Sequence, residues 1–518
     1  MSGHEGIAPL VEWAVSHGAR LHPAVQVYQD PRTGLSFRVN PSAPCAVQPY
    51  EPIVQLPTSL TLSYLNAVLE EEEEEQQHHH QHHHQHHHQH HHQHHHHHHR
   101  QLLAKAQPQV VGRLFLINEY LKADQSFWYP YIRALPQPDG PAWALPPFWP
   151  DEEAELLEGT NVEVGIEKIK ADVRRDYKEA RALLAAAAAA AAGCSSTCTC
   201  SCTCALPQDA LTVELYQWAY CIFSSRSFRA SLVLSAAQQS RLPDGVLVDD
   251  FSVLLPLFDV GNHDMTAEVR WHLDHASQRC ELQVGRAHRP GQQIFINYSM
   301  KTNAELLLGY GFMVPATPEL HNDYTHVRKR AAATADADDG AGEPQPSGEY
   351  LFSLRPLSHP SSVLARSKQS LQLDPSTKVL GSFQHVQPEM VWDIICTLTD
   401  REQRRRLLPP PAAAAAAAAG QDDQDRYHMD RFFSGQVAGE AAAVLEQTVA
   451  IIQHKVLQEL ERLNETDVEV VGGDWEGLTR NQRLALDYRG RCREVLESVL
   501  KAMSGDGMFD GEEPANAA

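Results

Sequence analysis

The sequence has no run of about eighteen apolar residues, so it contains no candidate for a transmembrane helix. It also has no excess of positive charge, since the formal net charge is −23 over 518 residues. Such an acidic chain is not expected to bind nucleic acid or an anionic membrane surface. Residues 1–20 lack both the apolar core of a secretory signal and the arginine-rich, acid-poor composition of a transit peptide. We therefore expect a cytoplasmic protein, or a fragment without its targeting segment, with the chloroplast and the nucleus left open.

The cysteine spacing is also unlike the isolated cysteine pairs that structural zinc sites favour. Between Cys198 and Cys204 the cysteines alternate with serine and threonine, and 18 of the 31 histidines lie in one tract, residues 71–99. Imidazoles and thiolates bind nickel or copper in vitro, but this spacing indicates no specific site, so we predict no native metal. The other cysteines are scattered among apolar residues, which is typical of reduced thiols in a reducing compartment.

Three low-complexity tracts interrupt the chain, at 71–99, 185–204 and 409–425. Such tracts cannot build a packed core and usually mark tolerated surface insertions. The length of the chain predicts two domains. Outside the tracts, the patterns predict short strands at 20–66, helices at 101–230, strands at 245–315 and mostly helix from about 348.

The clearest helix is predicted near the C-terminus, in the stretch "AAAVLEQTVAIIQHKVLQELERL". Its apolar residues recur at helical spacing and form one stripe, a pattern typical of a helix with one buried face. The members of this stripe are Leu445, Val449, Ile452, Val456, Leu460 and Leu463.

The stretch "VLLPLFDVGNHDM", residues 253–265, is the strongest candidate for a functional site. A short apolar run of this kind normally ends in a turn without chemical groups. Here it ends in Asp259, Asn262, His263 and Asp264. Taken singly, Asp259 could be a turn residue or a helix cap, and His263 could be a structural histidine.

Two further stretches carry candidate residues. In "GQQIFINYSMKTNAELLLGYGF" (291–312) a strand pattern precedes a helix pattern, and Tyr298 falls at the end of the strand. Tyr298 and Tyr310 could instead be core aromatics with hydroxyls bonded to the backbone. In "SSRSF" (224–228), Arg226 alone would more often be a surface charge or a partner of a carboxylate.

Taken in order, these stretches resemble the SET-domain protein methyltransferases. The closest class is that of the Rubisco large-subunit lysine methyltransferase, whose relatives include the actin-histidine methyltransferase. The resemblance covers most of residues 7–325, and its most specific parts are "DVGNHD" and "NYSMKTNAELLLGYGF". The matching stretches are "TGLSF" at 33–37, "SFWYPYIRALP" at 126–136, "FW" at 148–149, "YQWAYCIFSSRSF" at 216–228, "LLPLFDVGNHD" at 254–264 and "INYSMKTNAELLLGYGF" at 296–312.

The resemblance implies an α+β fold: a SET-domain β-fold with a knotted cofactor loop, split by a helical insert and followed by a mostly α-helical C-terminal lobe. The SET domain would span residues 7–325, with the insert at about 101–230 and insertions at 71–99 and 185–204. The lobe, which in this class helps to bind the protein substrate, would span 348–503 with the insertion 409–425. Residues 504–518 would form a disordered tail.

The resemblance also implies a binding site for S-adenosylmethionine. Asn262 and His263 would hold the cofactor in the knotted loop, so His263 would not act as a general base. Arg226 would bind the methionine carboxylate, a planar anion that suits a guanidinium. The complete cofactor set would be Thr33, Gly34, Leu35, Ser225, Arg226, Asp259, Asn262 and His263.

Tyr298 would be the catalytic residue. The residues that bind the substrate's target side chain would be Phe228, Asp259, Tyr298 and Tyr310. Methyl transfer is an in-line displacement that depends mainly on alignment and electrostatic preorganisation. The tyrosine hydroxyl would orient the attacking amine, which must first lose its proton because lysine is mostly charged at neutral pH. One residue departs from the family pattern: Thr33 stands where a small residue, usually glycine, is expected, and glycine's conformational freedom is absent there.

We therefore expect an S-adenosylmethionine-dependent protein N-methyltransferase, acting on lysine in a non-histone protein. The alternatives are a protein-histidine N-methyltransferase and a catalytically inactive SET-fold adaptor that binds protein partners. The expected partner is a protein substrate that presents a lysine or histidine side chain to a monomeric enzyme, with no role for nucleic acid or membrane. A metal-storage protein would rest only on the two tracts and is the least supported interpretation.

Overall fold

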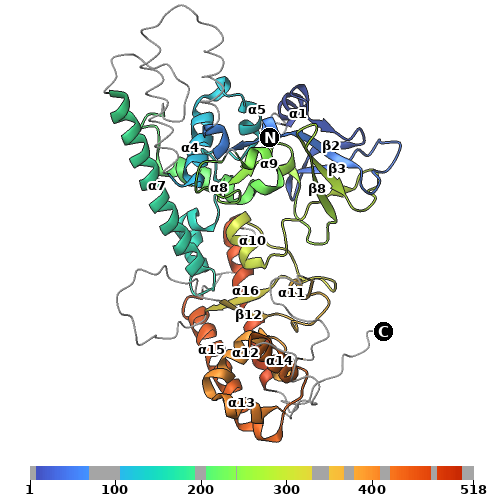
Figure 1. The fold of residues 1–518 in the computed structure, drawn as a ribbon, viewed down its shortest axis with the longest axis vertical. Helices are drawn as coiled ribbons and strands as arrows, with labels where there is room; N and C mark the ends of the chain where they lie inside the picture. The colour runs from blue at the N-terminus through green and yellow to red at the C-terminus, as the bar shows by residue number, and fades with distance from the viewer. Residues whose placement is uncertain are drawn as a thin grey trace, which may run out of the picture. The chain divides into compact units, whose positions relative to one another are not determined.

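The computed structural model describes residues 7–68, 106–192, 206–240, 242–328, 349–366, 379–408, 421–467, 475 and 477–504. The chain divides into two compact units (Figure 1). The first unit comprises residues 1–148 and 168–299, and the second comprises 149–167 and 300–518. Among the described residues, no helix is both long enough and apolar enough to cross a lipid bilayer.

The first unit is built on three small antiparallel sheets, each made from strands far apart in the sequence. One sheet has the order β1 (Arg20–Leu21), β4 (Pro52–Pro57), β9 (Arg279–Val284) and β8 (Val269–Asp274). The second has the order β10 (Gln293–Ile294), β3 (Gly34–Val39) and β2 (Val25–Asp30). The third has the order β5 (Leu62–Ser63), β7 (Ser252–Leu254) and β6 (Ser227–Arg229).

Helices complete the first unit and share one hydrophobic core with the sheets. The helical insert supplies most of them, as the sequence predicted for residues 101–230. They are α1 (Ile7–Ser16), α4 (Pro108–Leu121), α5 (Tyr129–Ala134), most of α7 (Glu163–Ala192), α8 (Val213–Arg226) and α9 (Ala236–Gln239).

The alanine-rich tract differs from its expectation as a loose insertion. Residues 185–192 continue helix α7, and Ala187 is buried. Alanine has the highest intrinsic helix propensity, so a run of it extends a helix that has already started. The rest of this tract and the whole of 71–99 lie outside the described residues.

The second unit is mostly helical, as expected for the C-terminal part of the chain. One hairpin, β11 (Tyr324–Arg328) with β12 (Glu349–Ser353), packs with these helices. The predicted stripe of α15 is confirmed, because Leu445, Val449, Ile452, Val456 and Leu463 are buried and Leu460 is partly buried against the same core. The helices are α6 (Asp151–Ala154), the first residues of α7, α10 (Asn303–Tyr310), α11 (Val363–Arg366), α12 (Pro388–Leu398), α13 (Arg401–Leu407), α14 (Gln421–Phe433), α15 (Ala442–Glu465) and α16 (Arg480–Met503).

One set of pairings in the first unit positions the candidate site. Strand β10 pairs with β3, with Ile294 opposite Phe37. Two residues further on, Ile296 forms a parallel bridge with His263. The segment 293–298 is therefore paired both with an early strand and with the loop that carries Asn262 and His263. This is the local arrangement that the predicted knotted loop requires.

Candidate functional site

The turn between β2 and β3 is shaped by Asp30 and Gly34. The Asp30 carboxylate accepts hydrogen bonds from the backbone N–H groups of Arg32 (2.9 Å) and Thr33 (3.0 Å). These donors stabilise the charged carboxylate and lower the pKa of Asp30 to about 2. Gly34 has a φ of +78°, the left-handed region that favours glycine, whereas Thr33 is not among the residues with positive φ. Threonine at position 33 is thus compatible with the turn, because the left-handed residue is Gly34.

Asn262 ties this turn to the late loop. Its side-chain amide donates to the carbonyl oxygen of Leu35 at 3.0 Å and also to the Ser36 hydroxyl. Gln293 donates to the same Ser36 hydroxyl at 3.0 Å, and Ser36 is fully buried. Two late segments, each more than two hundred residues away in the sequence, thus meet the early strand at Ser36.

His263 and Tyr298 form a stacked pair. Their ring centroids lie 4.9 Å apart with an interplanar angle of 19°. The backbone N–H of Tyr298 donates to Nδ1 of His263 at 3.1 Å. Nδ1 is therefore an acceptor, which fixes the neutral ring as the tautomer with its proton on Nε2. The buried His263 imidazole thus holds the backbone of Tyr298 in this structure.

The hydroxyl of Tyr298 points toward the same loop. It donates to the carbonyl oxygen of Gly261 at 2.7 Å. The next residue, Ser299, has a φ of +92°, which is rare for a residue with a side chain. A strained residue directly after Tyr298 indicates that the surrounding contacts hold this tyrosine in place.

Arg226 and Asp259 form an ion pair in which the carboxylate is buried. Nη1 of Arg226 lies 3.4 Å from Oδ2 of Asp259, and the side chains are 24% and 2% exposed. The hydroxyl of Tyr131 donates to the same Oδ2 at 3.0 Å. Burial raises the pKa of Asp259, while Arg226 and the Tyr131 hydrogen bond oppose that increase. Among the described residues, none accepts a hydrogen bond from Nε or Nη2 of Arg226.

Ser225 and Phe228 lie near this pair in sequence but have local partners. The Ser225 hydroxyl donates to the carbonyl oxygen of Cys221 in its own helix, at 2.8 Å. Phe228, on β6, packs against Trp271 with ring centroids 5.1 Å apart. Trp271 also packs against Phe258, the neighbour of Asp259, with ring centroids 5.4 Å apart.

Tyr310 belongs to the second unit, at the end of α10. The helix begins with a capping box formed by Thr302 and Glu305 and ends at Gly311 in the left-handed conformation. Nζ of Lys301 lies 5.7 Å from the centroid of the Tyr310 ring. Burial raises the pKa of the Tyr310 hydroxyl.

The first unit therefore brings two groups of predicted residues together. One group joins the 33–35 turn, Asn262, His263 and Tyr298, and the other joins Arg226 and Asp259. Sequence reasoning missed three contributors: Ser36, Gly261 and Tyr131. All three stand inside or beside stretches used for the resemblance, but their roles depend on contacts across more than thirty residues.

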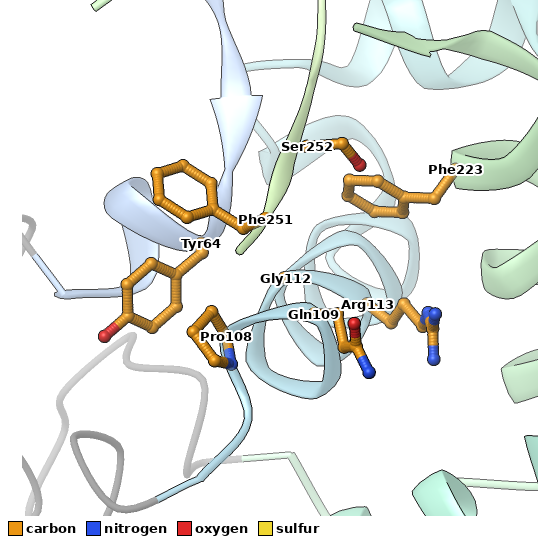
Figure 2. A pocket seen from close by; sticks show the side chains of 8 residues that line it. All are labelled: Tyr64, Pro108, Gln109, Gly112, Arg113, Phe223, Phe251 and Ser252. Carbon is orange, nitrogen blue, oxygen red and sulfur yellow. The ribbon is translucent and has the colours of Figure 1, made fainter. Parts of the chain in front are cut away.

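The cavities described in the first unit lie elsewhere. One, of about 30 Å³, is lined by α4, β7, Phe223 of α8 and the chain after β5 (Figure 2). Tyr64 and Phe251 pack together on one side of it, with ring centroids 5.3 Å apart. This volume has room for a water molecule but not for a nucleoside. A second hollow, of about 520 Å³, is lined by Pro147, Phe148 and residues of α7 and α8 that include Lys170 and Arg174, none of them a predicted site residue.

No cluster of three or more histidine, cysteine, aspartate or glutamate side chains that could hold a metal ion occurs among the described residues. The donors around Asn262 and Arg226 are amides, a guanidinium and hydroxyls. These groups suit an organic ligand that carries hydrogen-bonding edges and a carboxylate.

Comparison with known proteins gives related methyltransferases. The chain is 27% identical over 234 residues to the ribosomal lysine N-methyltransferase set10 of Schizosaccharomyces pombe, covering 43% of this chain and 36% of that protein. It is 22% identical over 323 residues to the protein-lysine N-methyltransferase EFM1 of Saccharomyces cerevisiae, covering 58% and 48%. It is 26% identical over 208 residues to the human actin-histidine N-methyltransferase, covering 39% and 30%. The chain thus spans less than half the length of these curated relatives, and no family model matches it.

Solved structures match over nearly the whole chain. The structure of Rubisco LSMT bound to AdoMet has a TM-score of 0.55 at 16% identity and covers 97% of this chain and 93% of that one. The SET domain of LSMT bound to lysine and AdoHcy has a TM-score of 0.53 at 15% identity and covers 96% and 91%. The predicted α+β fold class is therefore confirmed. This chain has the SET-domain fold of the Rubisco LSMT structures, and its relatives in sequence are protein lysine and histidine methyltransferases.

Proposed function

We propose that this protein is an S-adenosylmethionine-dependent protein N-methyltransferase that modifies a lysine of a non-histone protein. The observation that carries the proposal is the linkage of three predicted elements. The loop with Asn262 and His263 bonds to the β2–β3 turn through Leu35 and to Tyr298 through Nδ1 of His263. This linkage occurs in a fold shared with structures that bind AdoMet and lysine.

The donors present fit S-adenosylmethionine. Arg226 has Nε and Nη2 available for the amino-acid carboxylate, which would make a charge-assisted pair. The left-handed Gly34 gives a turn without a Cβ, which a ligand can approach closely. The amide hydrogens of Asn262 are already donated to Leu35 and Ser36, so its Oδ1 is the atom that would accept a hydrogen bond from the ligand. The cofactor, when bound, would supply a methyl group on a positively charged sulfur.

Tyr298 would align the amine that is methylated. Its hydroxyl donates its proton to the Gly261 carbonyl, and a phenolic oxygen can also accept, so the Tyr298 oxygen would orient a neutral amine by accepting a hydrogen bond from it. A desolvated channel would lower the lysine pKa and so favour the neutral, nucleophilic form. His263 would hold the backbone of Tyr298 without exchanging a proton.

Histidine is the second candidate target. The sequence similarity to actin-histidine N-methyltransferases, at 26% to 28% identity, favours it. An inactive adaptor is the remaining alternative. The hydrogen-bonded state of Tyr298, Asn262 and Arg226 supports an enzyme, because an adaptor does not need these contacts.

Several finer assignments belong to the same proposal. The substrate is a protein, Phe228 and Asp259 contribute to the channel for its target side chain, Tyr310 contributes to substrate binding from its own unit, and residues 348–503 form the lobe that binds the substrate. The protein acts as a monomer in the cytoplasm, without nucleic acid or membrane.

The test is transfer of a labelled methyl group. The full chain is incubated with labelled S-adenosylmethionine and a native extract, and the modified residue is mapped by mass spectrometry. We expect label on a protein lysine. Label on histidine would assign the second candidate, and absence of label from every protein would favour the adaptor.

Tyr298→Phe is the matched variant in this assay. It retains the ring that stacks on His263, so cofactor affinity should stay within about twofold and the loss of one hydrogen bond should cost about 1 kcal/mol of stability. The single-turnover rate should fall roughly 100-fold or more, equivalent to about 2.7 kcal/mol or more in the barrier. Tyr177→Phe is the control: it removes a hydroxyl on α7 that donates to the carbonyl oxygen of Leu211 at 3.1 Å, and the variant should transfer methyl at the parent rate. An unchanged rate in Tyr298→Phe would remove this residue from the reaction.

A further inference from the structure

Tyr131 is a buried residue that the proposed mechanism does not yet use. It lies on α5, is 1% exposed, and its hydroxyl donates to Oδ2 of Asp259 at 3.0 Å. A tyrosine that only filled the core could bond to any neighbouring backbone carbonyl. This one bonds instead to the carboxylate that pairs with Arg226.

Helix α5 is held firmly on both sides of Tyr131. Before it, the Trp128 indole donates to the carbonyl oxygen of Leu60 at 3.1 Å. After it, the Gln137 amide donates to the carbonyl oxygens of Ile132 (2.8 Å) and Leu135 (2.7 Å). Tyr131 is therefore a fixed donor, and its hydroxyl position limits where the Asp259 carboxylate can lie.

The shared oxygen connects Tyr131 to Arg226. Oδ2 of Asp259 accepts hydrogen bonds from both the Tyr131 hydroxyl and Nη1 of Arg226. Burial, and then the neighbouring Asp259 charge, raise the pKa of Tyr131 well above its usual value, so the hydroxyl keeps its proton and remains a donor. Without this donor, the buried carboxylate would have one partner fewer and could shift toward Arg226 or take up a proton. Either change would alter the direction of the remaining guanidinium donors.

We propose that Tyr131 is a positioning residue that, through Asp259, fixes Arg226 in the orientation needed to bind the carboxylate of the cofactor. This inference rests on the proposed function. It assigns to the helical insert an indirect part in cofactor recognition, through Asp259 and Arg226. The residue touches neither cofactor nor substrate, so its effect should be limited to the carboxylate end of the ligand.

Two probes separate positioning from general support of the fold. S-adenosylhomocysteine carries the amino-acid carboxylate, and 5′-methylthioadenosine lacks it. For Tyr131→Phe in the full chain, calorimetry should give a Kd for S-adenosylhomocysteine raised at least about fivefold, with the Kd for 5′-methylthioadenosine changed less than about twofold. In a protein that already carries Arg226→Gln, adding Tyr131→Phe should not raise the Kd for S-adenosylhomocysteine any further. Tyr177→Phe serves as the control and should change neither Kd.

Equal weakening of both probes would show a structural role, and unchanged binding of both would show no role; each result overturns the inference. If Tyr131→Phe does not fold, Asp259→Asn replaces it, since the amide retains the shape but removes the charge. Asp259→Asn should likewise raise the Kd for S-adenosylhomocysteine and leave the Kd for 5′-methylthioadenosine nearly unchanged. A parent protein that binds neither probe would instead overturn the proposed function, and this inference with it.

Discussion

Asn262 illustrates how one side chain acts at the residue scale. The family resemblance implies that it is a ligand of the cofactor, and the contacts of its amide show a structural role. By donating to Leu35 and Ser36, it holds the β2–β3 turn against the loop that carries His263. Loss of its side chain would therefore disturb both halves of the proposed pocket.

Asn262→Ala should weaken S-adenosylmethionine binding by roughly one to two orders of magnitude, since a hydrogen bond to a charged ligand contributes about 1.5–3 kcal/mol. Calorimetry on a folded variant measures the change. Asn297→Ala removes a nearby amide that donates to the carbonyl oxygen of Met265 (3.0 Å), and we expect it to bind the cofactor nearly normally. Parent affinity in Asn262→Ala would exclude Asn262 from the pocket.

At the element scale, segment 149–167 is attached to the helices of the second unit through buried polar contacts. Arg489 on α16 is 3% exposed and donates to the carbonyl oxygens of Leu156 (3.2 Å) and Leu463 (2.6 Å). Gly159 lies at the same junction with a φ of +74°. A Cβ at this position would lie 2.6 Å from the carbonyl oxygen of Arg462 and would also collide with the Thr466 hydroxyl.

Gly159→Ala should therefore destabilise the second unit by roughly 2–3 kcal/mol, because both the backbone angle and the space exclude a side chain. Thermal unfolding followed by circular dichroism measures this loss. Gly439→Ala is the matched control, since nothing lies within 4 Å of a Cβ built there. Equal melting temperatures for the two variants would contradict the close packing at Gly159.

The end of α7 permits a second test at this scale. Deleting 193–204 should leave the melting temperature nearly unchanged, since the length of chain between two packed elements alters closure entropy only slowly. Deleting 185–204 also removes about two turns of helix with the buried Ala187, and should cost roughly 1–2 kcal/mol. Deleting 71–99, like deleting 193–204, should leave the melting temperature nearly unchanged. A fall in stability or cofactor binding after the 71–99 deletion would show that this tract has a structural role.

For the whole molecule, the response to acid should depend on a buried histidine cluster in the second unit. His321 is fully buried, with Nδ1 2.9 Å from the Ser361 hydroxyl and Nε2 3.2 Å from the Ser353 hydroxyl. Burial first, and then the charges of Arg355, His359 and His385, lower the pKa of His321 to about 3. Its neutral form is therefore the one that the folded state retains.

Because the unfolded chain would protonate His321 near its usual pKa of about 6.5, unfolding takes up a proton at lower pH. The free energy of unfolding should thus fall as the pH decreases from about 6.5 to about 4.5, by up to about 1.4 kcal/mol per pH unit for this group. Over this range Asp30 contributes little, since its folded-state pKa of about 2 matters only below its usual value. Guanidinium unfolding at several pH values measures the slope, which His321→Gln should reduce. An unchanged slope in that variant would assign the acid sensitivity to other groups.

The sequence by itself determined the local features of this protein. The stripe on α15 and the position of Asn262 and His263 after a buried strand follow from periodicity and turn chemistry, whereas the left-handed conformation was expected at position 33 and was found at Gly34. Such features depend on neighbours within a few residues, and the local pattern is therefore sufficient to predict them.

Only the tertiary structure decided which of these features meet. Asn262 bonds to Leu35, 227 residues away, and Tyr131 bonds to Asp259 across 128 residues. The pairing of β10 with β3 and the bridge from Ile296 to His263 bring the first contact together, and the fixed position of α5 brings the second. Strand register and helix placement are properties of the whole folded core, and no pattern within a single segment specifies them.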